Sequence, residues 1–206
     1  MKLYFSPGAC SFAPHLALHE AGVSADAVKV DLRSHKTAET GDDYYAVNPK
    51  GYVPFLVLDD GTTLSEAHVI LQYIADRKPG TIAPAYGTIE RYKVNEWLGF
   101  VATEIHKSYS PLWHPAEFGE KAVDALKSKL HKRYEIVEAQ LAKTPYLAGN
   151  VYSIADMYLF TVTNWAHHLK VDLSAFPKTQ AWHKKIAERP AVAATQAAER
   201  GVKQAA

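Results

Sequence analysis

The hydrophobic periodicity of this chain changes once, close to residue 80, and the change limits the folds that are open to it. Before it, short apolar runs at 2–5 and 27–30 flank an amphipathic segment at 11–21, which predicts a right-handed βαβ unit with parallel strands. After it no strand pattern recurs, and long helical patterns take over. We therefore expect an α/β domain followed by an all-α domain.

The other short elements before residue 80 predict how the sheet is completed. Runs at 55–58 and 62–64 flank Asp59-Asp60-Gly61, a turn sequence typical of a β-hairpin, and a helix follows from Ser65-Glu66-Ala67. The order β-α-β, a polar connector, then β-β-α matches the thioredoxin-like arrangement. We predict a thioredoxin-like domain at 1–80, a linker at 81–88 and an all-helical domain at 89–206.

Three patterns describe the helical part. Apolar side chains recur every three or four residues from Val123 to Leu141, as in a helix that buries one stripe, and we interpret them as core packing. Ser153-Ile154-Ala155-Asp156 has the spacing of a capping box at the start of a buried helix. A further helix is predicted between Phe176-Pro177 and Arg189-Pro190.

The composition excludes some classes of partner. The chain has 206 residues, with 23 Lys and Arg against 22 Asp and Glu, so no charge excess favours nucleic acid or an anionic membrane. A single cysteine cannot form an internal disulfide, which fits a reducing compartment. We see neither a signal-peptide pattern nor an apolar run of the ~20 residues that span a bilayer. We therefore expect a cytoplasmic protein with no nucleic-acid or membrane partner.

The single cysteine, Cys10, lies in Phe5-Ser6-Pro7-Gly8-Ala9-Cys10-Ser11, between a predicted strand and a predicted helix. A thiol at a helix start faces unpaired backbone N–H groups and the positive end of the helix dipole, and both favour the thiolate. The alternative is a small buried hydrophobe, and the position alone leaves both readings open. Because Cys10-Ser11-Phe12-Ala13 is not a Cys-x-x-Cys motif, any redox chemistry needs an outside thiol.

Pro54 follows Val53 directly before a predicted strand. A cis bond here would leave the backbone groups of Val53 free to pair with an extended peptide. The sequence leaves both isomers open.

A set of motifs occurs in a joint order and spacing that is highly specific: Ala9-Cys10-Ser11, Asn48-Pro49-Lys50-Gly51-Tyr52-Val53-Pro54, Ser65-Glu66-Ala67 with Tyr73-Ile74-Ala75-Asp76, Glu96-Trp97 through Glu104-Ile105-His106-Lys107, and Ser153-Ile154-Ala155-Asp156. Together they resemble the bacterial beta-class glutathione S-transferases over nearly the whole chain. The resemblance implies a glutathione site on the thioredoxin-like domain, a hydrophobic substrate site on the helical domain, and a two-fold homodimer.

The resemblance also implies roles for particular residues. Glutathione is the co-substrate, and neither another cofactor nor a metal is expected. Thiol chemistry is assigned to Cys10, Ser11 and His106, and glutathione binding to Lys36, Val53, Glu66, Ala67 and Lys107. Free amides at a helix N-terminus suit the carboxylate of the γ-glutamyl end, and a histidine donor or an ammonium group stabilises a thiolate.

Two positions depart from the pattern of the family. Ala67 stands where many members carry serine, so a hydroxyl contact to glutathione is lost and the backbone amide must suffice. Gly99 stands where relatives often carry asparagine, which removes a side-chain donor. We expect these changes to weaken glutathione binding and to make thiol activation more dependent on Ser11 and His106.

The implied function is transfer of reduced glutathione to a hydrophobic electrophile, with thiol-disulfide or peroxide chemistry as a side activity. Tyr109, Trp113 and Phe118 either line the apolar half of that pocket or belong to the core. A non-catalytic protein that binds glutathione or a hydrophobic ligand on the same fold is the alternative. The presence of Cys10, Glu66 and His106 favours the enzyme.

Histidine pairs complete the candidates. His15 and His19 stand four residues apart, but the Glu of a zinc-protease motif is missing, and we interpret them as a solvated or half-buried helix face. Of the adjacent His167 and His168, at most one is expected to face a substrate cleft, because neighbouring helical residues point in different directions.

Overall fold

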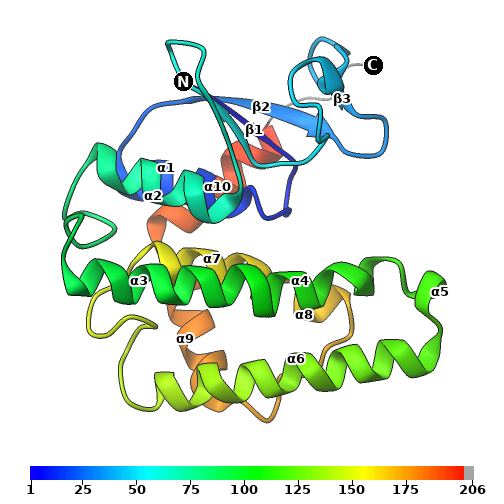
Figure 1. Ribbon diagram of the computed structural model, residues 1–206, viewed down its shortest axis with the longest axis vertical. Helices are drawn as coiled ribbons and strands as arrows, with labels where there is room; N and C mark the ends of the chain where they lie inside the picture. The colour runs from blue at the N-terminus through cyan, green and yellow to red at the C-terminus, as the bar shows by residue number, and fades with distance from the viewer. Residues whose placement is uncertain (202–206) are drawn as a thin grey trace. The chain divides into compact units, whose positions relative to one another are not determined.

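The computed structural model describes residues 1–201, which form two compact units (Figure 1). The first unit consists of residues 1–82 together with the described residues from 188 onward, and the second consists of residues 83–187. The chain therefore leaves the first unit, forms the second and returns to the first.

The last helix departs from the predicted division at 1–80 and 89–206. Helix α10 (Pro190–Gly201) belongs to the first unit, where the Arg189 guanidinium binds Glu20 and the Glu199 carboxylate contacts His15. The change of pattern near residue 80 does not show which core a later helix covers, and this is why the predicted division placed α10 with the helical domain. Residues 202–206, predicted in the helical domain, lie outside the described residues.

The first unit is built on a five-stranded sheet with the order β3-β2-β1-β4-β5. β1 and β2 are parallel, whereas β4 is antiparallel to both β1 and β5, so the predicted βαβ unit and hairpin are confirmed. β3 pairs antiparallel to β2 and was not predicted, because a two-residue strand shows no periodicity. The strands are β1 (Lys2–Phe5), β2 (Asp26–Asp31), β3 (Lys36–Thr37), β4 (Phe55–Val57) and β5 (Thr63–Ser65).

Helices α1 (Phe12–Ala21), α2 (Ala67–Arg77) and α10 gather beside the strands of this unit (Figure 1). α1 ends at Gly22, whose φ of 59° is the left-handed conformation that glycine adopts at low cost. Pro14 lies in the first turn of α1, where its missing N–H is harmless. A short 3₁₀ turn, η1 (Tyr44–Ala46), interrupts the connector between β3 and β4.

The second unit is helical. In α6 the predicted stripe is buried at Leu130, Tyr134, Val137 and Leu141. A continuous helical path runs through α3 and a π-helical turn, η2, into α4. The elements are α3 (Ile89–Phe100), η2 (Val101–His106), α4 (Lys107–Tyr109), the 3₁₀ turn η3 (Ser110–Trp113), α5 (Pro115–Phe118), α6 (Glu120–Leu141), α7 (Ile154–Thr163), α8 (Trp165–His168) and α9 (Pro177–Ala187). The predicted fold class, a thioredoxin-like α/β part and an all-helical part, is confirmed.

The predicted capping box of α7 is present and reaches further than the sequence shows. One carboxylate oxygen of Asp156 accepts from the Ser153 amide at 3.0 Å and from its hydroxyl at 3.1 Å. The other accepts from the Leu147 amide at 3.0 Å and from the Trp182 indole N–H at 3.1 Å. This fully buried carboxylate therefore joins the loop before α7, the start of α7 and the middle of α9.

Candidate active site

Strand pairing brings several candidate segments to one end of the sheet. Lys36 pairs with Asp31 at the carboxyl end of β2, and Tyr4, near the carboxyl end of β1, pairs with Phe55 at the start of β4. Phe55 also pairs with Ser65 at the end of β5. Because β1 and β2 are parallel, these pairs lie at the same end of the sheet. The segments that meet there carry Cys10, Lys36, Val53, Glu66 and Ala67.

Cys10 lies between β1 and α1 with its thiol directed at the loop before β4. Its Sγ donates to the Val53 carbonyl at 3.2 Å, and the residue is half-buried. A hydrogen bond of 3.0 Å from the Ala9 amide to the Ser6 carbonyl closes the turn before it. The Val53–Pro54 peptide bond is cis. Val53 therefore contacts the thiol, while its amide donates to no backbone acceptor within residues 1–201.

Ser11 is fully buried, and its hydroxyl closes the same loop. Its Oγ accepts from the Ser6 amide at 3.1 Å and donates to the Ser6 carbonyl at 3.2 Å. The hydroxyl is thus engaged within the turn that precedes Cys10. Its expected role in thiol chemistry stays a prediction, whereas its role in shaping the loop follows from this geometry.

Glu66 and Ala67 form the start of α2. Glu66 has a φ of 73°, which is uncommon for a residue with a Cβ, and its carbonyl accepts from amides of the first helical turn at 3.0 Å. The amides of Ala67 and His68 are left without helical partners. The half-exposed Glu66 carboxylate lies 3.8 Å from Lys50 Nζ. A carboxylate beside free helix amides suits a ligand end that carries both an ammonium and a carboxylate group.

Lys36 begins β3 and is exposed. Backbone pairing with Asp31 and an isolated bridge to Asp43 fix its main chain at the edge of the sheet. Its ammonium group is therefore available to a ligand at this end of the sheet.

The residue before Lys36 packs against the loop that leads to Val53. His35 stacks on Tyr45 with 4.5 Å between ring centroids, and both rings lie against Gly51. A Cβ on Gly51 would lie 2.6 Å from Tyr45 Cε1, and the φ of Gly51 is +67°. Glycine is therefore required here on two grounds, backbone conformation and space.

His106 and Lys107 lie in the second unit, at the end of the π-helical turn and just after it. His106 Nδ1 lies 2.6 Å from the Tyr158 hydroxyl, and its ring packs edge-on against Trp165 at 5.0 Å. Burial and the nearby Lys107 charge lower the pKa of His106 to about 4, so the ring is neutral at pH 7. π-helical turns are frequent at functional sites. The expected approach of His106 and the exposed Lys107 to the Cys10 thiol stays a prediction.

Of the three aromatic candidates in the second unit, one is buried and two are exposed. Tyr109 is fully buried, and its hydroxyl lies 3.0 Å from that of Tyr134, so it belongs to the core and is unavailable as a pocket wall. Trp113 and Phe118 are each 46% exposed. These two stay candidates for contact with a hydrophobic substrate.

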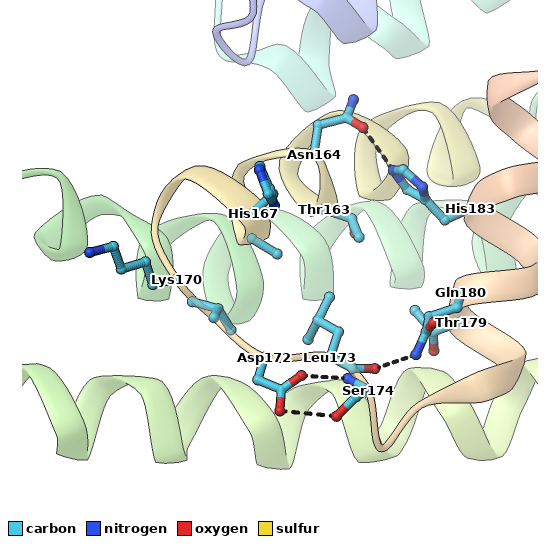
Figure 2. Close-up of a pocket in the computed structure, with 12 residues that line it drawn as sticks. Thr163, Asn164, His167, Lys170, Asp172, Leu173, Ser174, Thr179, Gln180 and His183 are labelled. Carbon is cyan, nitrogen blue, oxygen red and sulfur yellow. Dashed lines mark hydrogen bonds between the residues drawn. The ribbon is translucent and has the colours of Figure 1, made fainter.

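A pocket of about 840 Å³ lies in the second unit around the end of α7, α8 and the start of α9 (Figure 2). On one side His183 Nε2 lies 2.7 Å from Asn164 Oδ1, and burial lowers the pKa of His183. His167 lines this pocket, whereas His168 is not among its lining residues. Trp113 is likewise absent from its wall. Its wall combines polar side chains with the apolar Ala166, Val171 and Leu173.

Sequence reasoning missed two residues that contact candidate segments. Tyr158 binds His106 from α7, and Glu199 accepts from the Gly8 amide, two residues before Cys10. A signal existed in each case. Tyr158 is a hydroxyl within the apolar run 157–160, and Glu199 is a carboxylate in an alanine-rich helix. A polar group at a buried position needs a partner, so both side chains were candidates for a tertiary hydrogen bond, although the sequence does not name the partner.

His15 is buried, contrary to the expectation of a solvated or half-buried face, because α10 covers it. Its Nδ1 lies 3.3 Å from Glu199, while His19 Nδ1 lies 2.8 Å from the Thr195 hydroxyl. Residues 1–201 contain no group of three His, Cys, Asp or Glu side chains that suits a metal ion. Within the same range, every helix is too short or too polar to cross a membrane.

Two family models match the chain. The glutathione S-transferase N-terminal domain matches residues 8–77, and the glutathione S-transferase C-terminal domain matches residues 100–190. Glutathione S-transferase GstA of Escherichia coli O157:H7 is 44% identical over 194 residues, which cover 93% of this chain and 95% of that protein. The chain belongs to the glutathione S-transferase family.

Solved structures of the family agree. A sphingomonad glutathione S-transferase complexed with glutathione is 44% identical, with a TM-score of 0.92 over 98% of this chain and 100% of that chain. The bacterial beta-class glutathione S-transferase of Sphingomonas chungbukensis is 45% identical, with a TM-score of 0.91 over 98% of this chain and 100% of that chain. The predicted resemblance to the beta class, the transferase function and the enzyme class are thereby confirmed.

A more distant relative represents another chemistry of the family. The disulfide-bond oxidoreductase YfcG of Escherichia coli (strain K12) is 27% identical over 201 residues, which cover 93% of this chain and 92% of that protein. The relatives thus favour an enzyme over a non-catalytic binding protein.

Proposed function

We propose that this member of the glutathione S-transferase family binds glutathione along the end of the sheet in the first unit and transfers it to hydrophobic electrophiles. The observation that carries the proposal is the 3.2 Å contact from the Cys10 thiol to the Val53 carbonyl. It places the only thiol of the chain beside the backbone that an extended peptide would pair with. Cys10 therefore lies where the cysteinyl sulfur of glutathione is expected.

The dimensions of the sheet support this placement. Lys36 and Glu66 lie at opposite edges, on β3 and directly after β5. Four inter-strand spacings make about 19 Å between these edges, and an extended tripeptide spans about 10 Å. The Lys36 and Glu66 side chains can cover the difference from both sides. Lys36 would then meet the glycyl carboxylate, with Glu66 and the Ala67 amide at the γ-glutamyl end.

The charges of the site suit thiolate chemistry. The nucleophile is the glutathione thiolate, and the start of α1 supplies backbone N–H groups and a favourable dipole. We assign His106 a hydrogen-bond donor role, since its neutral ring has no positive charge to offer at pH 7. Lys107 supplies the positive charge in this assignment. Trp113 and Phe118 are our candidates for contact with the electrophile.

Cys10 also allows a redox side activity. Its thiolate attacks one sulfur of oxidised glutathione, a bond forms between Cys10 and that sulfur, and the original disulfide breaks. Reduced glutathione leaves as a thiolate, and a second glutathione can resolve the mixed disulfide. The similarity to a disulfide-bond oxidoreductase supports this chemistry.

The experiment is a glutathione-dependent assay with an aryl halide, an epoxide, an organic peroxide and a mixed disulfide, applied to wild type, Cys10→Ala and Cys10→Ser. We expect conjugation of the aryl halide or the epoxide. Both variants should keep part of it, since the nucleophile belongs to the ligand, and should lose disulfide reduction. Inactivity on all four substrates, with glutathione binding retained in calorimetry, would instead establish the non-catalytic alternative.

We further propose a cytoplasmic homodimer. The single cysteine and the balanced charge support the location, and the family supports the dimer. Sedimentation equilibrium at micromolar concentration should give twice the 22.8 kDa chain mass. A mass equal to one chain at all concentrations would contradict the dimer.

A further inference from the structure

Glu199 of α10 is a buried carboxylate that contacts the loop carrying Cys10. One of its oxygens accepts from the Gly8 amide at 3.1 Å, and the other lies 3.3 Å from His15 Nδ1. The side chain is 4% exposed. A buried carboxylate is costly unless its oxygens are paired, so both contacts fix its position. The Gly8 amide thereby has a defined partner in a helix 191 positions away in the chain.

The histidines of α1 hold this carboxylate in place. His15 packs between Phe5 and His19, with ring-centroid distances of 5.2 and 5.1 Å. The His19 ring binds Thr195, one turn before Glu199 in α10. Burial and the neighbouring His15 lower the pKa of His19, against an opposing effect of Glu199. The carboxylate is thus fixed against α1 and directed at the loop.

The attachment of α10 to α1 has a second anchor away from the loop. Arg189 binds the Glu20 carboxylate through Nε and, at 2.9 Å, through one of its terminal nitrogens. This pair lies at the other end of α10 from Glu199. Of these two anchors, the contact between Glu199 and Gly8 is the one that reaches the segment 6–10.

We propose that Glu199 is a positioning residue for the Cys10 loop, so that the last helix of the chain contributes to the glutathione site. The inference rests on the proposed function, because it assumes that Cys10 meets the glutathione sulfur. The Gly8 amide lies two residues before Cys10, in a turn closed by Ser6, Ala9 and Ser11. Small displacements of reacting groups cause large losses of rate.

The test compares two reactions of the same thiol. The first is mixed-disulfide formation with oxidised glutathione, which needs both the site and its geometry. The second is alkylation by iodoacetamide, which needs only an accessible thiol. The ratio of the two rate constants isolates positioning from exposure. Hydrogen exchange of the amides at 6–10 reports the order of the loop without any glutathione.

For Glu199→Ala we expect the rate ratio to fall about tenfold and exchange at 6–10 to accelerate. Glu199→Gln keeps an acceptor for Gly8 and a group that can pair with His15, so it should retain most of the ratio. Glu20→Gln is the matched control, because it weakens the anchor between α10 and α1 without touching the loop. It should lower the melting temperature and leave the ratio unchanged.

If Glu199→Ala lowers the melting temperature while the ratio and the exchange stay unchanged, Glu199 is only structural and the inference is wrong. Should that variant fail to fold, Glu199→Asp takes its place, since it keeps the charge but cannot reach both partners. A wild-type protein that does not react with oxidised glutathione would overturn the proposed role of Cys10. The exchange rates of the loop would then still decide the positioning role of Glu199.

Discussion

The imidazole of His106 and the hydroxyl of Tyr158 form a hydrogen-bonded pair in the second unit, with 2.6 Å between Nδ1 and the oxygen. They belong to η2 and α7, two elements that pack against each other. Because the ring is largely buried, its pKa falls to about 4. A neutral imidazole is therefore part of the folded state at neutral pH.

This pair predicts a pH dependence of stability. Between pH 6.5 and about 4 the unfolded chain binds a proton at His106 that the folded chain does not bind. The stability that the neutral ring contributes is thus complete above pH 6.5 and is lost as the pH falls towards 4. At pH 5 the loss should be about 2 kcal/mol relative to pH 7. Urea unfolding of His106→Asn at both pH values should show a smaller decrease than wild type, and an equal decrease would contradict the assignment.

Asp156 predicts a large effect on stability. Replacing it with alanine leaves the Leu147 and Ser153 amides and the Trp182 indole buried without their acceptor. We expect Asp156→Ala to lower the free energy of unfolding by about 3 kcal/mol or more. Asp172→Ala is the control, because the hydrogen bonds of that exposed carboxylate within residues 1–201 go to Ser174 in its own turn, and it should change stability by less than about 1 kcal/mol. If the two variants lose similar free energies of unfolding, the buried hydrogen bonds of Asp156 contribute no more to stability than those of the exposed Asp172.

Glu66 allows stability and ligand binding to be separated. Its φ of 73° is unfavourable for glutamate and acceptable for glycine. The free energy of unfolding of Glu66→Gly should therefore equal that of Glu66→Ala or be higher, by up to about 1 kcal/mol. Both variants should bind glutathione more weakly, by about 1 to 3 kcal/mol, since a charge-assisted contact is lost. Calorimetry decides this point, and unchanged affinity would mean that the γ-glutamyl end binds elsewhere.

Two glycines form a matched pair. Gly51 and Gly61 have φ values of +67° and +84°, but only at Gly51 does a Cβ meet other atoms, the closest at 2.6 Å. Gly61→Ala should lower stability by about 1 kcal/mol, from backbone strain alone. Gly51→Ala should lose about 1 to 3 kcal/mol more from overpacking against Tyr45 and His35. Thermal unfolding of both variants tests this, and equal losses would show that the two rings move aside freely.

The sequence predicted the parts of the fold that carry a strong local pattern. The hairpin around Gly61, the helix after Glu66 and the capping box at Ser153 are visible because turn and cap chemistry requires particular residue types. The two-residue strand at Lys36 and the π-helical turn before Lys107 were missed. Neither has a repeating sequence pattern. Both depend on backbone hydrogen bonding, which no particular side chain indicates.

The part of the candidate site that follows from the order of strands and loops could be predicted from the sequence. Strand pairing places Val53 and Glu66 at the same end of the sheet as the Cys10 loop, as their order in the chain implied. Tyr158 and Glu199 were missed because each meets its partner only through tertiary packing, 52 and 191 residues away in the chain. The interior position of Tyr109 was left open for the same reason, since its partner Tyr134 lies on another helix.

The first unit draws its residues from both ends of the chain, and this has a consequence for biosynthesis. Residues 1–82 emerge from the ribosome early. Helix α10, which covers His15 and holds the Cys10 loop, is the last described element to emerge. Domains usually fold as units in the order of their synthesis. Here the nascent sheet must persist with one flank of α1 uncovered while more than one hundred further residues are made. A transcript truncated shortly after residue 187 would encode every strand of the sheet, yet yield a protein without that cover.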